Sequence, residues 1–443
     1  MQSVSDCLDE TLRLARAAGA RRAEVYHVSG TGRTVEYADR GFESYRGSDA
    51  AGLGLRVFVG RKAGFASGQD FSASGLERLA ARAVESAGLA DLPGFPTPCG
   101  LPLRDDLAVF DAAGIAVSVA DDRVCLEQIV AETRAANPAV RRIKTVSLRS
   151  GHGTTSVRSS TGTDASYRRS SFSLAVGVVA ERAGESEIGW EAETATARGA
   201  LPWADIGGLA AAKAVTRLGA GKAPSGRQPV ILEREVAADF LSLLGAMLSA
   251  DAVLKGRSLL AGKLGAAVAF RSVIILDDLT LPGAVGSAPC DDERQPTRRK
   301  VLIDGGVLRG YLHSLETAHR MGGDPTGNGF RGDYGALPLP RPGNLVLQPG
   351  SHDPASWTRE QRAIVVVDDI LGSHTMNPVS GDFSVGASGF VFEQGRQRPF
   401  RGATIAGNLA TLFAAVAEIG SDLKFFGSVA APSVLVSALD VSG

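Results

Sequence analysis

Residues 172–178 read FSLAVGV, a run in which large apolar side chains alternate with small ones. Because successive side chains of a β-strand point to opposite faces of a sheet, this alternation predicts a strand with one buried face. Residues 53–59, LGLRVFV, repeat the pattern with Leu53, Leu55, Val57 and Val59 on one face. Both runs lie in the first half of the chain and predict a sheet there.

Helical patterns flank these strands twice. The first series has a helix with the apolar stripe Val4, Leu8 and Leu12, the 53–59 strand, a helix at residues 72–87, and a proline-rich connector at residues 91–105. The second has a helix at 120–136 with Val124, Ile129 and Val130 inward, strands at 143–149, 155–159 and 166–180, and a helix at 204–219. This order predicts an N-terminal α+β domain, residues 1–222, built on an antiparallel sheet, with similar sub-units at 1–90 and 106–222 as one way to divide it.

The second half of the chain has a different pattern. A short apolar strand at residues 230–232 runs directly into a helix with one apolar face, formed by Val236, Phe240, Leu243, Leu244 and Met247. Gly, Pro and Asp punctuate residues 277–350, and a final helix at about 406–420 precedes a last strand at 434–436. We therefore expect residues 223–443 to form a Gly-rich, mainly-β domain shaped as a barrel or a sandwich. The overall fold class is α+β.

Composition excludes several classes of protein. The 443 residues carry 47 basic and 48 acidic side chains, so bulk electrostatic binding to nucleic acid is not expected. No apolar run reaches the roughly 20 residues of a membrane helix, and the acidic N-terminus does not resemble a secretory signal. The four cysteines are scattered without a C-x-x-C pair, which is typical of a reduced, cytoplasmic protein.

Several motifs favour structural roles over catalytic ones. Residues 327–332 match G-x-G-x-x-G, but proline-rich surroundings replace the strand and helix that a phosphate site needs, so we expect a turn. No G-x-S-x-G elbow occurs, and three acidic neighbours should keep the Cys290 thiol protonated. The pair Asp277-Asp278 and the run Asp291-Asp292-Glu293 offer oxygen ligands for Mg²⁺ or Ca²⁺, although acidic residues in turns more often cap backbone amides. The six histidines lack the spacing of a zinc helix.

Taken together, motifs along most of the chain resemble those of the TldD/PmbA family, historically labelled "modulator of DNA gyrase". The resemblance rests on Gly52–Val59 with Ala66-Ser67, residues 277–278, 289–293 and 326–329, Gly381-Asp382-Phe383-Ser384, Gly402–Leu409 and Ala431-Pro432-Ser433. It implies a cytoplasmic peptidase made of two related chains. TldD-type chains bind zinc through a His-Glu-x-x-x-His helix and a later Cys, whereas PmbA/TldE-type chains lack these ligands.

This sequence has lost the zinc ligands at the positions that match the family motif. Residues 234–239 read REVAAD, so Arg234 and Asp239 replace the two histidines and only Glu235 remains. Residues 429–432 read VAAP where the later Cys is expected. Without imidazole or thiolate, nothing here is expected to hold zinc, and we assign no catalytic residue and no metal or other cofactor to this chain. Because Glu235 lies in the first turn of its helix, interaction with the helix dipole is a sufficient role for it.

The resemblance implies a non-catalytic PmbA/TldE-like subunit. A TldD-type partner is then expected to carry the zinc, and both chains to enclose an extended, unfolded or leader peptide, with no nucleic acid and no membrane involved. Two alternatives stay open. The chain could be a stand-alone homodimeric scaffold that binds peptides, or a hydrolase that holds a hard metal on Asp277 and Asp291. The sequence identifies no peptide-contacting residue.

Overall fold

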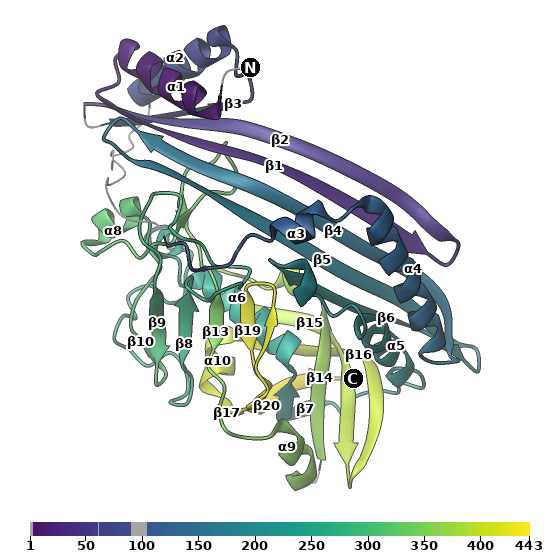
Figure 1. The fold of residues 1–443 in the computed structure, drawn as a ribbon. Helices are drawn as coiled ribbons and strands as arrows, with labels where there is room; N and C mark the ends of the chain where they lie inside the picture. Colours follow the sequence, from purple (N-terminus) through teal and green to yellow (C-terminus); the bar gives the residue numbers. More distant parts are fainter. Residues whose placement is uncertain (1–2, 61, 90–103, 362) are drawn as a thin grey trace.

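The computed structural model describes residues 3–60, 62–89, 104–361 and 363–443 (Figure 1). The predicted connector at 91–105 therefore lies outside the described residues except for its last two positions. A long six-stranded sheet forms the N-terminal part, in the order β3-β2-β1-β4-β5-β6, and every neighbouring pair is antiparallel. Its strands are β1 (Arg22–Ala38), β2 (Gly41–Val59), β3 (Lys62–Gly68), β4 (Val140–Ser159), β5 (Asp164–Arg182) and β6 (Glu185–Ala195).

Helices cover this sheet at its two ends. Near one end, α1 (Val4–Ala17) and α2 (Ala73–Leu89) pack on Leu53, Leu55 and Val57, which are almost completely buried. Near the other end, α3 (Ala112–Ala116), α4 (Val119–Ala135) and α5 (Ile206–Thr216) lie against the sheet, with the short turn η1 (Arg198–Ala200) beside them. Phe172, Leu174, Val176 and Val178 form the core under α4 and α5 with no exposed surface. The alternation at 172–178 thus predicted both the strand and its buried face correctly.

Three sequence expectations for this part need correction. Residues 140–159 form one continuous strand instead of two, because Gly151 and Gly153 of β4 pair directly opposite Gly32 and Gly30 of β1, so the ladder is not interrupted. Val124 is 64% exposed, because α4 turns Leu126, Ile129 and Thr133 toward the sheet instead. Val4 likewise lies outside the core at 48% exposure.

The C-terminal domain is built around a closed five-stranded barrel, in agreement with the predicted barrel-like domain. The strands follow the order β16-β15-β14-β7-β20, and β16 pairs with β20 to close the ring. Helix α6 (Arg234–Met247) contributes Phe240, Leu241 and Leu244 to the same core. The barrel strands are β7 (Gly226–Leu232), β14 (Ala363–Leu371), β15 (Asp382–Glu393), β16 (Arg396–Asn408) and β20 (Val434–Ser442).

A second sheet packs beside the barrel in the order β10-β9-β8-β13-β19-β18. Its strands are short: β8 (Ile275–Asp278), β9 (Arg299–Asp304), β10 (Val307–Leu308), β13 (Leu345–Leu347), β18 (Lys424–Phe426) and β19 (Val429–Ala431). The remaining elements are α7 (Ala250–Leu254), α8 (Leu315–Met321), β11 (Gly329–Phe330), β12 (Leu339–Pro340), α9 (Pro354–Glu360), η2 (Ser373–Thr375), α10 (Leu409–Ala414) and β17 (Val416–Ile419). None of the described helices is both long and apolar enough to cross a membrane.

The helix predicted at 406–420 is wrong in its length. Strand β16 continues to Asn408, whose side chain caps the short helix α10, and residues 416–419 form β17. The apolar spacing in 406–420 fits a helix, but Val416 and Ile419 pair with β20 instead. Pairing between distant segments therefore overrides the local pattern here.

Two glycines of the 52–59 strand allow the C-terminal domain to dock on the N-terminal sheet. A Cβ atom at Gly52 would lie 2.4 Å from the Tyr334 ring, and one at Gly54 would lie 2.3 Å from the Tyr334 carbonyl oxygen. The loop around Tyr334 therefore lies directly on the backbone of β2. The glycines in this strand allow the two domains to pack closely. The alternation of apolar residues in the sequence does not predict this role.

We predict that Gly54→Ala destabilises the protein by about 1–3 kcal/mol, because the opposing backbone atom has little freedom to move away. Gly208→Ala in α5 is the matched control, since a Cβ there meets nothing within 4 Å and alanine favours helix. Thermal unfolding of both variants checks this. A Gly54→Ala midpoint equal to that of the wild type would contradict the docking geometry.

Candidate functional site

The residues that the sequence placed at the degenerate zinc motif lie at the N-terminal end of α6. Strand β7 leaves the barrel at Leu232, and the helix begins two residues later at Arg234. Arg234 directs its Nε toward Asp422, at 3.6 Å, whereas the Glu235 carboxylate accepts a hydrogen bond from Lys213 Nζ at 3.0 Å. Asp239 follows one turn later on the exposed side. Arg234 and Asp239 are five residues apart, about 140° around the helix, so they point in different directions.

The hairpin of β18 and β19 packs beside α6. It contains residues 429–431, where the sequence expected the later ligand, and Ala430 and Ala431 are fully buried. Asp422, just before this hairpin, accepts hydrogen bonds from the backbone N–H and the hydroxyl of Ser433, at 2.9 and 2.8 Å. The fold therefore brings together the two segments that the family resemblance connects, although they are almost 200 residues apart in the sequence.

Charged side chains cross from the N-terminal sheet to this region. Lys213 of α5 lies between Glu191 of β6, at 2.7 Å, and Glu235 of α6, at 3.0 Å. Lys424 of β18 contacts Glu191 and Glu193 at 3.3 and 3.7 Å. The site therefore lies at the junction of the two parts of the chain, where β6 and α5 meet α6 and β18.

Arg217, at the end of α5, makes a further bridge across the same junction. Its guanidinium contacts Asp368 and Asp369 of β14 at 3.3 and 3.0 Å. Lys213, Arg217 and Lys424 could not be identified from the sequence, because nothing in the local pattern connects α5 or β6 to α6. An unusual feature that could have pointed to the junction is the run of alternating acidic residues at 185, 187, 191 and 193, which puts several carboxylates on one face of β6.

Burial, together with neighbouring negative charges, raises the pKa of acidic groups at this junction. Burial, with smaller contributions from the charges of Glu235 and Asp369, raises the pKa of Asp239 to about 6. Burial and the charge of Asp368 likewise raise the pKa of Glu233. Burial alone would lower the pKa of Lys213, but Glu191 and Glu235 raise it, so this lysine remains an ammonium ion.

The side chains at the motif positions do not match a zinc site. Zinc in proteins prefers imidazole and thiolate ligands, and the structure places a guanidinium at 234 and small apolar groups at 430 and 431. The surviving Glu235 already interacts with an ammonium group, which repels a second cation. Within the described residues, no group of three or more His, Cys, Asp or Glu side chains is arranged to hold a metal ion.

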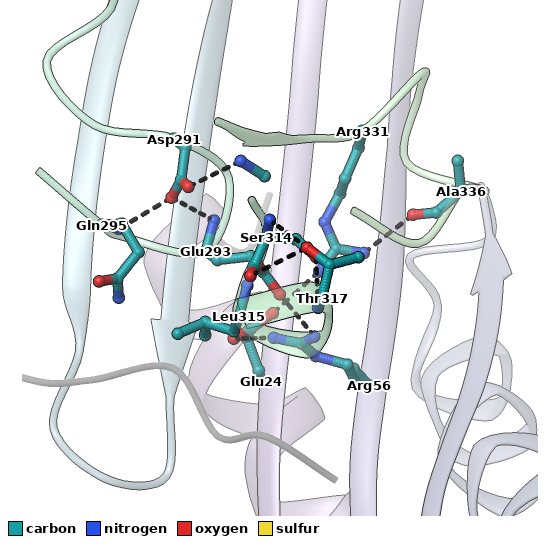
Figure 2. Close-up of polar contacts among 11 residues, drawn as sticks. Glu24, Arg56, Asp291, Glu293, Gln295, Ser314, Leu315, Thr317, Arg331 and Ala336 are labelled. Atoms are coloured by element: carbon teal, nitrogen blue, oxygen red, sulfur yellow. Dashed lines mark hydrogen bonds and ion pairs between the residues drawn. The ribbon is translucent and has the colours of Figure 1, made fainter. Parts of the chain in front are cut away.

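The acidic run Asp291-Asp292-Glu293 lies away from α6, under strands β1 and β2. Its carboxylates accept hydrogen bonds from the protein (Figure 2). Asp291 accepts from the backbone N–H groups of Glu293, Gln295 and Gly329, and Asp292 accepts from the N–H of Arg331. These are the turn-capping contacts expected of acidic residues in loops.

Glu293 belongs to a buried network of four charges. Arg56 contacts Glu24 and Glu293 at 3.1 Å each, and Arg331 contacts Glu24 at 2.8 Å. Glu24 and Arg56 come from the N-terminal sheet, and Glu293 and Arg331 from loops of the C-terminal domain. Two positive and two negative groups balance one another, so this network is a neutral connection between the domains. The sequence did not identify Glu24, Arg56 or Arg331 as its members.

Asp277 and Asp278 also have protein partners. Asp277 is fully buried, lies 3.1 Å from Lys300 Nζ and accepts hydrogen bonds from Asn328 Nδ2 and the Gly343 N–H. Asp278 accepts from the N–H and hydroxyl of Thr280. Because Asp277 and Asp291 interact with different donors in this way, the structure gives no support to a shared hard-metal centre.

The glycine motif at residues 327–332 and the Cys290 thiol also lie in surroundings that favour a structural role. Residues 327–332 contain β11, which pairs with β12, and in the part of the chain that the structure describes no helix begins at these glycines. The pKa of the Cys290 thiol is raised to about 11, chiefly by burial. The sequence attributed a raised value to the acidic neighbours, and their charges contribute less than burial does.

Replacing Lys213 should show that its two ion pairs contribute unequally to the stability of the protein. The Glu191 side chain is 8% exposed and the Glu235 side chain 53% exposed. We therefore expect a coupling energy of about 1–3 kcal/mol between Lys213→Met and Glu191→Gln, and below about 1 kcal/mol between Lys213→Met and Glu235→Gln. Urea unfolding of the single and double variants measures both. Equal coupling energies would contradict this arrangement.

The raised pKa of Asp239 predicts a pH dependence of stability. A carboxyl group whose pKa is higher in the folded state makes the protein lose stability as pH rises from about 4 to about 6, with no further change above. Because this side chain is partly exposed, we expect Asp239→Asn to be more stable than the wild type by only about 1 kcal/mol above pH 6. The difference should vanish near pH 3.5.

NMR titration of the Asp239 carboxyl carbon gives a direct check of that prediction. Glu235→Gln removes a neighbouring negative charge and should lower the titration midpoint. An unchanged midpoint in Glu235→Gln, or an ordinary aspartate midpoint in the wild type, would show that the junction is more open to water than described.

Known proteins of one family match this chain over most of its length. Models of the PmbA/TldA metallopeptidase family match residues 23–87 (domain 1), 114–218 (central domain) and 225–443 (C-terminal domain). The chain is 27% identical to a metalloprotease PmbA homolog of Haemophilus influenzae over all of this chain and 96% of that protein. It is 28% identical to the metalloprotease TldD homolog of the same organism, over 81% of this chain and 76% of that protein.

A solved structure gives the same result. A Thermotoga maritima protein described as a modulator of DNA gyrase superimposes with a TM-score of 0.91 at 27% identity, covering 99% of this chain and all of that one. Identity to PmbA and TldD relatives is nearly equal, so it does not separate the two branches. Three consecutive family domains and a shared fold over the whole length establish that the chain belongs to the TldD/PmbA family of metallopeptidases.

Proposed function

We propose that this chain is the non-catalytic, PmbA/TldE-type subunit of a TldD/TldE-type metallopeptidase. The observation that carries the proposal is the Lys213–Glu235 ion pair at the position where zinc-binding relatives need a free glutamate. A glutamate that acts as general base must accept a proton from a metal-bound water, and here an ammonium group lies 3.0 Å from it. Arg234, already directed at Asp422, supports the same assignment.

In this proposal a TldD-type partner holds the zinc ion and carries out hydrolysis. The present chain completes the enclosure of the site and grips an extended peptide. Sheet edges suit such a substrate, because backbone hydrogen bonds give affinity without strong sequence demands. The described cysteines, Cys7, Cys125 and Cys290, form no disulfide, in keeping with the cytoplasmic location that we propose.

Co-expression with a TldD-type chain tests the proposal. We expect the two chains to co-purify and to hydrolyse an unfolded peptide only together. Glu235→Gln in this chain should leave the rate within about twofold, whereas Gln at the matching glutamate of the partner should reduce it by a factor of about 10² or more. The control is the same partner variant without this chain.

Other outcomes would contradict the assignment in distinct ways. Hydrolysis by the present chain alone, abolished by Glu235→Gln, would make it a catalytic subunit. A homodimer of this chain that persists when the TldD-type chain is in excess would instead favour the stand-alone peptide-binding scaffold.

A further inference from the structure

A cavity of about 540 Å³ opens beside the junction, where the end of β6 meets the loop at residues 281–285 and strand β18. Its lining is mainly apolar and includes Ala195, Pro202, Leu281, Val285 and Phe425. Leu281, Val285 and Phe425 are only partly buried. The volume lies within the range of roughly 300–1,000 Å³ that is typical of ligand pockets, which also occur preferentially between domains.

Hydrogen bonds fix the loop that forms one wall of the cavity. The Gly283 N–H donates to the Leu107 carbonyl at 2.7 Å, and the Gly283 carbonyl accepts from the Thr196 hydroxyl at 2.6 Å. The Leu281 carbonyl accepts from the Ser287 hydroxyl, also at 2.6 Å. The cavity is therefore largely formed before any ligand enters, which reduces the entropy lost on binding.

The surroundings favour an extended peptide as the ligand. Strands β6 and β18 are the last strands of their sheets, and both contribute to the cavity lining. Edge strands have backbone groups available for pairing with an added chain. An apolar cavity between two sheet edges accommodates one side chain of a peptide whose backbone runs along either edge.

The charge beside the cavity favours a basic sequence. Glu193 lines the cavity itself, and its contact with Lys424 leads toward the acidic junction. In that direction a series of ion pairs joins Glu193, Lys424, Glu191, Lys213 and Glu235, in which three carboxylates outnumber two ammonium groups. Negative residues next to the bound side chain would be repelled there, whereas lysine or arginine would be attracted.

We propose that this cavity binds an apolar side chain of an extended peptide whose neighbouring residues carry positive charge. The inference rests on the proposed function in taking a peptide as the ligand. It goes further in assigning peptide contacts and a sequence preference to the chain that lacks the zinc ligands. This chain then selects substrate and is more than a structural support for its partner.

Fluorescence anisotropy with the full chain alone tests the proposal. The probe is the fluorescein-labelled peptide Ser-Thr-Lys-Leu-Lys-Thr-Ser, compared with versions in which Leu is replaced by Ser or both Lys by Glu. We expect the Leu-to-Ser change to weaken binding about tenfold or more, because burial of the apolar side chain is lost. The peptide in which Glu replaces both Lys residues should also bind more weakly. Added salt should reduce the difference in affinity between this peptide and the original one, because salt screens the charges.

Cavity-filling variants locate the binding site. Ala284→Trp and Ala200→Trp should each weaken binding of the Leu peptide about tenfold, and both alanines line the cavity. Ala81→Trp is the control, because Ala81 is an exposed residue of α2 outside the cavity. Circular dichroism and thermal unfolding confirm that each variant is folded, and two separate filling sites keep the test valid if one variant does not fold.

The proposal is overturned if the wild type binds none of the peptides, if the Ser or Glu version binds as tightly as the Leu–Lys version, or if folded filling variants bind like the wild type. These outcomes are separate from those for the proposed function. Peptide binding by this chain without assembly with a TldD-type chain would overturn only the proposed subunit role. Assembly and joint hydrolysis without peptide binding here would overturn only the present inference.

Discussion

Charges buried between the two parts of the chain must each find a partner of opposite sign, and the relative placement of the domains depends on this constraint. Glu24 and Glu293 are at most 2% exposed in their side chains, and Arg331 is completely buried. Leaving any of them unpaired in such a place would cost several kcal/mol. Each glutamate of this network contacts an arginine contributed by the other part, so these ion pairs stabilise the observed arrangement of the sheet and the C-terminal domain.

The same constraint operates at the opposite end of the interface, where Lys213, Arg217 and Lys424 connect β6 and α5 to the barrel and the second sheet. At that end, the ion pairs also involve the first residues of α6, which affects whether this helix can bind a metal ion. A helix whose first residues are held by internal ion pairs contributes to assembly and is poorly suited to bind a metal ion. Glu235, at a position that matches the zinc motif, thus belongs to the ion pairs that connect the two parts of the chain.

Much of the fold could be predicted from the sequence, because the strongest signals are local. Alternation at 172–178 and 53–59 identified buried strand faces, and the apolar stripe after residue 232 identified the helix α6. The errors arose where distant pairing decides the structure. Glycines of β1 opposite those of β4 keep one strand continuous, and pairing with β20 makes residues 416–419 a strand. The bridges made by Glu24, Arg56 and Lys213 depend on contacts that no local pattern encodes.

The proposed subunit role requires that the start of α6 holds ion pairs and no catalytic metal ion. Metal content measured by mass spectrometry on the purified chain, alone and after exchange against excess zinc, tests it most directly. We expect far less than one zinc ion per chain in both samples, with no change in Glu235→Gln. One tightly held zinc ion per chain that is lost in Glu235→Gln would contradict the account.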